Sequence, residues 1–157
     1  PGTMAGYTRV CLERSVAAAA ATSPAERTAA GAALRVSVEA ALAAADVLVV
    51  PTMGALSLAA GEDYDERPLV VDGRPLEHFC DAALTPPFNA AGACPVVAVP
   101  SGAVGAHGVP IGVQVVARAG DERTALRAAA ALERERPGGR PPLEALAAAS
   151  ASPSGGG

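Results

Sequence analysis

Two short apolar runs, each bounded by proline and glycine, constrain the fold of this chain more than any other feature. Val96 to Val99 and Ile111 to Ala117 are rich in β-branched residues, and a loop of glycine, proline and histidine separates them. Such runs predict β-strands, and their spacing favours an antiparallel pair. Asp121 is a good N-cap for a helix that follows at once. We expect its inward face to consist of Leu126, Ala129, Ala130 and Leu132.

A long helix is expected in the first third of the chain. Ser23 and Glu26 have the spacing of a capping box, and Pro24 stands at the first helical position. The helix should continue to about Ala45. Its apolar residues recur every four positions, which predicts one narrow face against a core: Leu34, Val38 and Leu42.

The segment after this helix predicts a third strand and then a long loop. Val47 to Val50 is a continuous aliphatic run, which indicates a strand buried on both faces, and Pro51 ends it. Residues 52 to 75 have the composition of a loop. We expect a helix from about Leu76 to Leu84, interrupted by two prolines, and a short helical turn from Phe88 to Ala93.

The composition predicts a weakly stable core. Half of the 157 residues are hydrophobic, yet there are only two tyrosines, two phenylalanines and no tryptophan, while about a quarter of the residues are alanine. Small side chains bury little apolar area, at about 25 cal/mol per Å². We therefore expect one domain, residues 1 to 136, that packs on something larger. Residues 137 to 157, rich in proline, glycine, serine and alanine, should form a disordered tail.

Charge and cysteine content exclude several classes of function. The net charge of −4 and the pI near 5.1 provide no basic surface for nucleic acid or anionic membranes. No apolar run is long enough to cross a bilayer. Three cysteines indicate no disulfide framework, so the expected location is the reducing cytoplasm.

Several motifs over Ala32 to Glu133 together resemble the C-terminal end of the amidase signature family. Asp46 to Thr52 reads DVLVVPT, Thr85 to Gly92 reads TPPFNAAG, and Gly108 to Gln114 reads GVPIGVQ. The resemblance implies an α/β fold in which a few strands of a mixed sheet are flanked by helices. From the sequence we expect no cofactor and no metal.

The same resemblance implies that the reactive groups lie elsewhere. Amidase signature enzymes use a serine, a cis-serine and a lysine, which the family carries in its N-terminal half. This sequence has no lysine, and none of its eight serines is adjacent to another. Arginine stays protonated and cannot act as the base. No catalytic residue is therefore expected here, and the chain resembles a C-terminal segment of an amidase.

The expected partner is an N-terminal amidase segment or a full-length relative. A small-molecule amide would bind only to the completed enzyme. The alternative is a non-catalytic remnant that packs on or regulates a full-length relative. Five residues are candidates for the wall of a substrate pocket: Thr52, Met53, Phe88, Asn89 and Gln114.

For some residues a structural role competes with a functional one. Gln114 lies in an apolar run, so its amide should bond to backbone groups, and Asn89 is more typical of a turn or helix cap. His78 and Cys80 are suitable as metal ligands or as a catalytic pair. On a helix, however, they would point about 200° apart. The acidic run at 62 to 66 lacks the spacing of a calcium loop.

Overall fold

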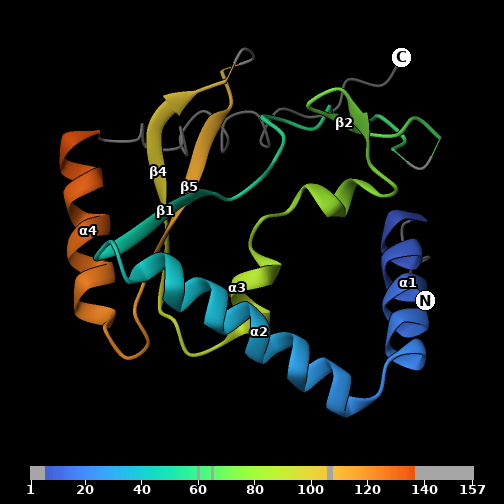
Figure 1. Cartoon of the computed structure of the whole chain (residues 1–157). Helices are drawn as coiled ribbons and strands as arrows, with labels where there is room; N and C mark the ends of the chain where they lie inside the picture. Colours follow the sequence, from blue (N-terminus) through green and yellow to red (C-terminus); the bar gives the residue numbers. More distant parts are fainter. Residues whose placement is uncertain (1–5, 60, 65, 106–107, 137–157) are drawn as a thin grey trace, which may run out of the picture.

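The computed structural model describes residues 6–59, 61–64, 66–105 and 108–136. The expected tail, residues 137 to 157, lies outside these ranges. The described chain has the expected α/β fold (Figure 1). In chain order its elements are α1 Gly6–Ala21, α2 Pro24–Leu42, β1 Val47–Pro51, β2 Val70–Val71, β3 Arg74–Pro75, the 3₁₀ helix η1 Phe79–Ala82, α3 Pro86–Ala91, β4 Val96–Val104, β5 Pro110–Ala117 and α4 Glu122–Glu135.

A three-stranded antiparallel sheet forms the centre of the fold. The strand order is β1-β5-β4, so β5 pairs on both sides and the expected antiparallel pairing of β4 with β5 is confirmed. Helix α4 packs on one face of the sheet (Figure 1). The core on this face is built from small and β-branched residues: Val99, Val115 and Ala129, with Val47, Val97, Val113, Ala128 and Leu132 around them.

The expectation that β1 is buried on both faces was wrong. Val49 is 53% exposed, and no residue of β1 is fully buried. The physical reason is its position, because β1 pairs with β5 on one side and the described residues place no strand on the other. An aliphatic run whose composition is typical of an interior strand thus lies at an edge of the sheet.

Helix α2 begins as expected. The Ser23 hydroxyl accepts a hydrogen bond from the Glu26 amide at 3.2 Å, and the Glu26 carboxylate accepts one from the Ser23 amide at 2.7 Å. These two bonds form the capping box. The bond from the Ser23 backbone N–H lowers the pKa of Glu26.

The apolar face of α2 is covered only toward its C-terminal end. Leu42 is fully buried and Val38 is half-buried, but Leu34 is 37% exposed. Arg118 fixes the end of the helix by donating to the carbonyl oxygens of Leu42 at 2.8 Å and Ala45 at 2.9 Å. A cation at the carbonyl groups of a helix C-terminus is favourable. The first half of α2 therefore presents apolar surface that the described chain does not cover.

A glycine allows α2 to cross close to α3. A Cβ atom added at Gly31 would lie 2.9 Å from the carbonyl oxygen of Ala90, a backbone atom that cannot rotate away. We expect Gly31→Ala to lower the free energy of unfolding by about 1 kcal/mol, because overpacking of about 1 to 3 kcal/mol exceeds the gain in helix propensity. Urea denaturation measures this.

A change in the opposite direction, Ala33→Gly, provides the matched control. Ala33 is exposed on the same helix, so this change should cost only helix propensity, about 1 kcal/mol. If Gly31→Ala instead made the chain more stable, α2 would not approach α3 this closely in solution.

The region before α3 differs from the expectation. The helix expected over Leu76 to Leu84 is only the 3₁₀ helix η1. The helical turn expected over Phe88 to Ala93 is α3, which begins two residues earlier, at Pro86, and ends at Ala91. Both prolines occupy the first helical turn, where no intrahelical amide bond is required. Asn89 consequently lies inside α3 and caps neither end, since Thr85 and Gly92 hold those positions.

Helix α4 begins at the expected residue, but its inward face is shifted. Asp121 accepts a hydrogen bond from the Thr124 amide at 3.1 Å. Ala125 and Ala129 are the buried residues, whereas Leu126 is 59% exposed. Among the described residues, no helix combines the length and the hydropathy that crossing a bilayer requires.

Candidate functional site

A cavity of about 490 Å³ lies where β1 ends and β5 begins. It is lined by residues 51–58, which run from the last residue of β1 into the loop that follows, and by Val109, Pro110, Ile111 and Gly112. Two of the expected pocket residues, Thr52 and Met53, are part of this wall.

Thr52 is held by hydrogen bonds on both of its sides. Its backbone amide and its hydroxyl both donate to the carbonyl oxygen of Gly112, at 3.2 and 3.1 Å. Its own carbonyl oxygen accepts from the Leu84 amide at 3.0 Å. A Cβ atom at Gly112 would lie 3.0 Å from the Thr52 hydroxyl oxygen, so glycine permits this close approach. These hydrogen bonds therefore fix the position of Thr52 in the cavity wall.

The next two residues continue this attachment to the segment after η1. Met53 forms a bridge with Ala83, and the Gly54 amide donates to the Ala82 carbonyl at 2.7 Å. This short antiparallel contact attaches the loop that lines the cavity to the backbone of residues 82 and 83.

Gln114 supports the wall from behind. Its side chain is 1% exposed, and its amide nitrogen donates to the carbonyl oxygens of Pro51 at 3.1 Å and Leu84 at 3.0 Å. The expected backbone partners are thus present. Both protons of the amide are used, so Gln114 joins the end of β1 to the segment that precedes α3.

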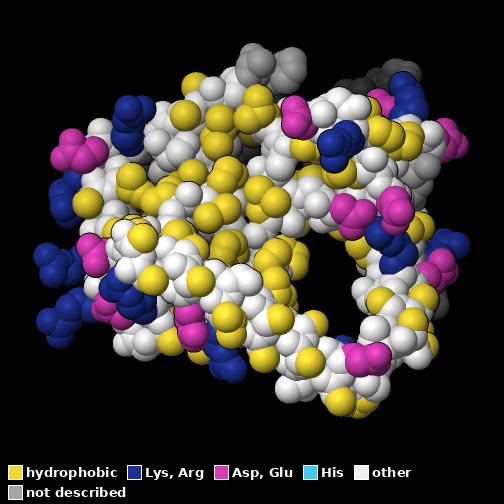
Figure 2. All heavy atoms as spheres, in the orientation of Figure 1, with side chains coloured by type: hydrophobic (Ala, Val, Ile, Leu, Met, Phe, Trp, Pro, Cys, Tyr) yellow, Lys and Arg dark blue, Asp and Glu magenta, His cyan; other side chains and the backbone are white. Residues whose placement is uncertain are grey.

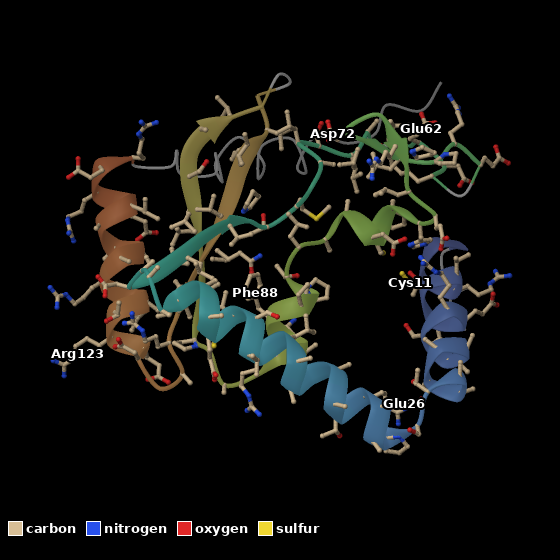
Figure 3. The ribbon with its side chains drawn as sticks, viewed as in Figure 1. Cys11, Glu26, Glu62, Asp72, Phe88 and Arg123 are labelled. Carbon is tan, nitrogen blue, oxygen red and sulfur yellow. The ribbon has the colours of Figure 1, made fainter. Side chains whose placement is uncertain are left out.

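The other two expected pocket residues lie on a different element. Phe88 and Asn89 both belong to α3, and neither lines the cavity next to β1. Phe88 is half-buried on α3, the helix that α2 crosses (Figure 3), while Asn89 is exposed. The structure therefore brings together Thr52 and Met53, supported by Gln114, and leaves Phe88 and Asn89 apart from them.

The described part of the cavity wall is mostly apolar. Among its described lining residues, none has a side chain that titrates, and only Thr52 and Ser57 carry a hydroxyl group. Acid–base catalysis requires a group that exchanges a proton near neutral pH. These described residues can therefore shape a ligand site.

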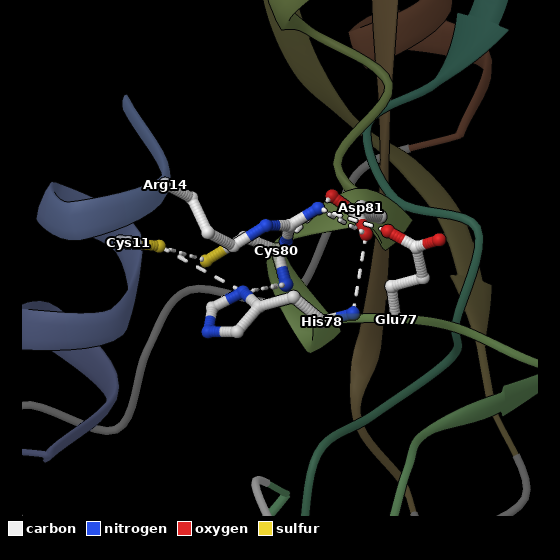
Figure 4. Close-up of polar contacts among 6 residues, drawn as sticks. All are labelled: Cys11, Arg14, Glu77, His78, Cys80 and Asp81. Atoms are coloured by element: carbon white, nitrogen blue, oxygen red, sulfur yellow. Dashed lines mark hydrogen bonds and ion pairs between the residues drawn. The ribbon is translucent and has the colours of Figure 1, made fainter. Parts of the chain in front are cut away.

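A second polar site lies between α1 and η1 (Figure 4). The sulfur of Cys11, on α1, is 3.0 Å from the sulfur of Cys80 and 3.8 Å from Nδ1 of His78. His78 precedes η1 in an extended conformation, so its ring turns back and Nδ1 accepts a hydrogen bond from the Cys80 amide at 3.2 Å. The expectation that residues 78 and 80 point apart was wrong, because His78 is not in a helix.

Charged groups next to these three residues join the same two elements. Arg14 of α1 donates to both carboxylate oxygens of Asp81, at 3.3 and 3.2 Å, and lies 3.6 Å from Glu77. The bond to Asp81 raises the pKa of Arg14. Cys11 is separated from residues 78 and 80 by more than sixty positions, so local spacing in the sequence could not reveal this site.

The thiol of Cys80 is poorly suited to nucleophilic catalysis. Burial, followed by its contact with Cys11, raises the pKa of Cys80 to about 11. The thiolate is the nucleophilic form, so this raised pKa disfavours Cys80 as a nucleophile.

Comparison with known proteins gives consistent matches. The family described as Amidase matches residues 8–126. A glutamyl-tRNA(Gln) amidotransferase subunit from Parvibaculum lavamentivorans is 39% identical over 88 residues, covering 56% of this chain and 16% of that protein. The 6-aminohexanoate-cyclic-dimer hydrolase from Paenarthrobacter ureafaciens is 38% identical over 95 residues, covering 56% of this chain and 18% of that protein.

A solved structure of 6-aminohexanoate cyclic dimer hydrolase aligns with a TM-score of 0.43 at 30% identity, over 68% of this chain and 23% of that chain. This chain thus spans less than a fifth of the length of the two relatives named above. The family match includes the cavity next to β1 and most of the sheet, and it extends over three quarters of the 157 residues. The chain belongs to the amidase family.

Proposed function

We propose that this chain forms the C-terminal part of an amidase, in which it completes the wall of the amide-binding pocket. The serine, cis-serine and lysine that perform the chemistry are contributed by residues outside these 157. The observation that carries the proposal is the absence of lysine from the sequence, because the family mechanism uses a lysine as its general base and arginine, which stays protonated, cannot replace it.

Within the described part of the chain, β1 pairs on one side only, and this unpaired edge supports the need for a further segment. Thr52 bonds to Gly112 across the ladder, and Val50 stands opposite Gln114. Since hydrogen-bonded pairs alternate in an antiparallel ladder, the amide and carbonyl groups of Val47 and Val49 face away from β5. Such an edge is a template for another strand.

The space beside this edge is suitable for another strand. A cavity of about 560 Å³ lies between the start of β1 and α4, lined by Asp46, Val47 and one side of α4. An added strand next to β1 would cover this cavity and the exposed side chain of Val49. A space-filling view also shows an opening between α1, α2 and the rest of the molecule, with hydrophobic side chains along its rim (Figure 2). An upstream amidase segment is the occupant that we propose for both surfaces.

The test is complementation. The full chain is co-expressed with an amidase-family segment that carries the serine loop and the lysine, and hydrolysis of simple amides is measured. We expect the chain alone to be inactive. The pair should exceed the catalytic segment alone by about a hundredfold, the size of loss that a substrate misplaced by about 1 Å can cause.

The control replaces the lysine of the catalytic segment with alanine, which should return the pair to background. Stable association without a gain in turnover would favour the alternative, a non-catalytic remnant that packs on a relative. Failure to associate at all would reject both functions.

A further inference from the structure

The site between α1 and η1 contains three side chains of a kind that binds transition metals. They are two thiols, Cys11 and Cys80, and one imidazole, His78, and their donor atoms all lie within 4.8 Å of one another. They come from two elements that are far apart in the sequence, and the expectation from sequence was that no metal site exists.

The distances are close to those of a tetrahedral zinc site. With Zn–S near 2.3 Å and Zn–N near 2.0 to 2.1 Å, neighbouring donors are about 3.5 to 3.8 Å apart. The Cys11 sulfur is 3.8 Å from Nδ1 of His78, which already agrees. The two sulfur atoms are 3.0 Å apart, so they must separate by about 0.7 Å. Cys11 is half-buried on a surface helix, and a small movement of α1 provides this separation.

The histidine ring has the tautomer that metal binding requires. A backbone N–H can only donate, so the bond from the Cys80 amide shows that Nδ1 carries a lone pair. The ring is 3% exposed and therefore held in one orientation. Half-buried cysteines on one side leave a path by which an ion can enter.

We propose that Cys11, His78 and Cys80 bind one zinc ion through both sulfur atoms and Nδ1. Each thiol releases its proton to solvent as its sulfur coordinates the ion, and no group is oxidised or reduced. Nδ1 exchanges its hydrogen bond with the Cys80 amide for the metal. The fourth coordination position is taken by water or by an exogenous ligand.

A disulfide between Cys11 and Cys80 is the competing interpretation. A disulfide would join the two sulfur atoms but would not account for the position of His78 Nδ1 close to Cys11. Its formation also requires an external oxidant. The convergence of three donors therefore favours the metal.

Zinc at this site would attach α1 to the rest of the domain. None of the described side chains of α1 is fully buried, and Cys11 and Arg14 are contacts that join it to residues 77–81. Binding of the ion to the docked form alone should slow hydrogen exchange in α1. The slowing reaches about a hundredfold when free zinc is about a hundred times the Kd. This proposal does not depend on the amidase function.

The test titrates the reduced full chain with Co²⁺ as a spectroscopic probe and then with Zn²⁺. We expect intense sulfur-to-cobalt charge-transfer bands and the visible bands of a tetrahedral ion, saturating near one ion per chain and lost on addition of zinc. Cys11→Ser, Cys80→Ser and His78→Gln should each weaken binding by more than about a hundredfold, since even changes outside the coordinating residues cost about 10 to 100-fold.

Cys94→Ser is the matched control, because Cys94 is the third cysteine and is not among the three donors; it should bind as the unaltered chain does. X-ray absorption of the zinc-loaded unaltered chain should show two sulfur neighbours and one imidazole. This measurement uses no variant, so misfolding of a variant cannot affect it. Absent charge-transfer bands, binding unaffected by the three substitutions, or a Cys11–Cys80 disulfide that forms in the presence of excess thiol would each overturn the proposal.

Discussion

Val49→Pro should abolish complementation by a catalytic amidase segment while leaving the isolated chain folded. The Val49 amide faces away from β5 in the ladder register. Proline therefore removes the donor that an added strand would use, and edge strands tolerate proline where no ladder bond is required. We expect amide hydrolysis by the pair to fall about a hundredfold, to the level of the catalytic segment alone, because the substrate is no longer positioned. Turnover and co-purification are the measurements.

The matched control is Val49→Thr. Threonine keeps the backbone amide and the strand propensity of a β-branched residue, so complementation should persist. Circular dichroism of the isolated Val49→Pro chain should be unchanged. Normal turnover of the proline variant would show that the segment does not add to this edge, and loss of turnover with both variants would indicate that the side chain matters instead of the backbone.

Gln114→Leu should destabilise the isolated chain by about 2 to 4 kcal/mol. Leucine has a similar size but leaves the carbonyl oxygens of Pro51 and Leu84 without their donor. A buried acceptor that loses its partner costs about 1 to 3 kcal/mol. Urea denaturation should show a lower midpoint with an unchanged slope, because the surface exposed on unfolding is nearly the same.

Thr52→Val is a milder change in the same region. It removes the hydroxyl bond to Gly112, yet the carbonyl oxygen of Gly112 keeps the Thr52 amide as a partner. The expected cost is about 1 kcal/mol. If Gln114→Leu costs no more than Thr52→Val, the two amide bonds contribute little and the support of the cavity wall lies elsewhere.

Local patterns predicted the elements whose determinants are local. The capping box of Ser23 and Glu26 and the N-cap of Asp121 depend on residues three positions apart, and both are present. The antiparallel pairing of β4 with β5 follows from two apolar runs joined by a short loop, and it was also confirmed. The backbone partners of Gln114 could be expected, because an amide in an apolar run must find them.

The errors arose where the outcome depends on neighbours that are distant in sequence. The aliphatic run of β1 reads as interior, yet its outer side is uncovered in the described chain. Leu126 fits an inward helical face by spacing, yet it is 59% exposed, and Ala125 is buried together with the expected Ala129. The group of Cys11, His78 and Cys80 depends on where α1 lies, and no periodicity in the sequence specifies that position.

The cavity wall between β1 and β5 has a consequence for selectivity. Its described lining carries neither a positive nor a negative group, from Pro51 through Leu58 and from Val109 through Gly112. A ligand that contacts only this surface is selected by its shape and size, because the surface has no charged group that would distinguish a charged ligand from a neutral one. In the amidase that we propose, discrimination between a charged amide and an uncharged one would fall to groups outside these described lining residues.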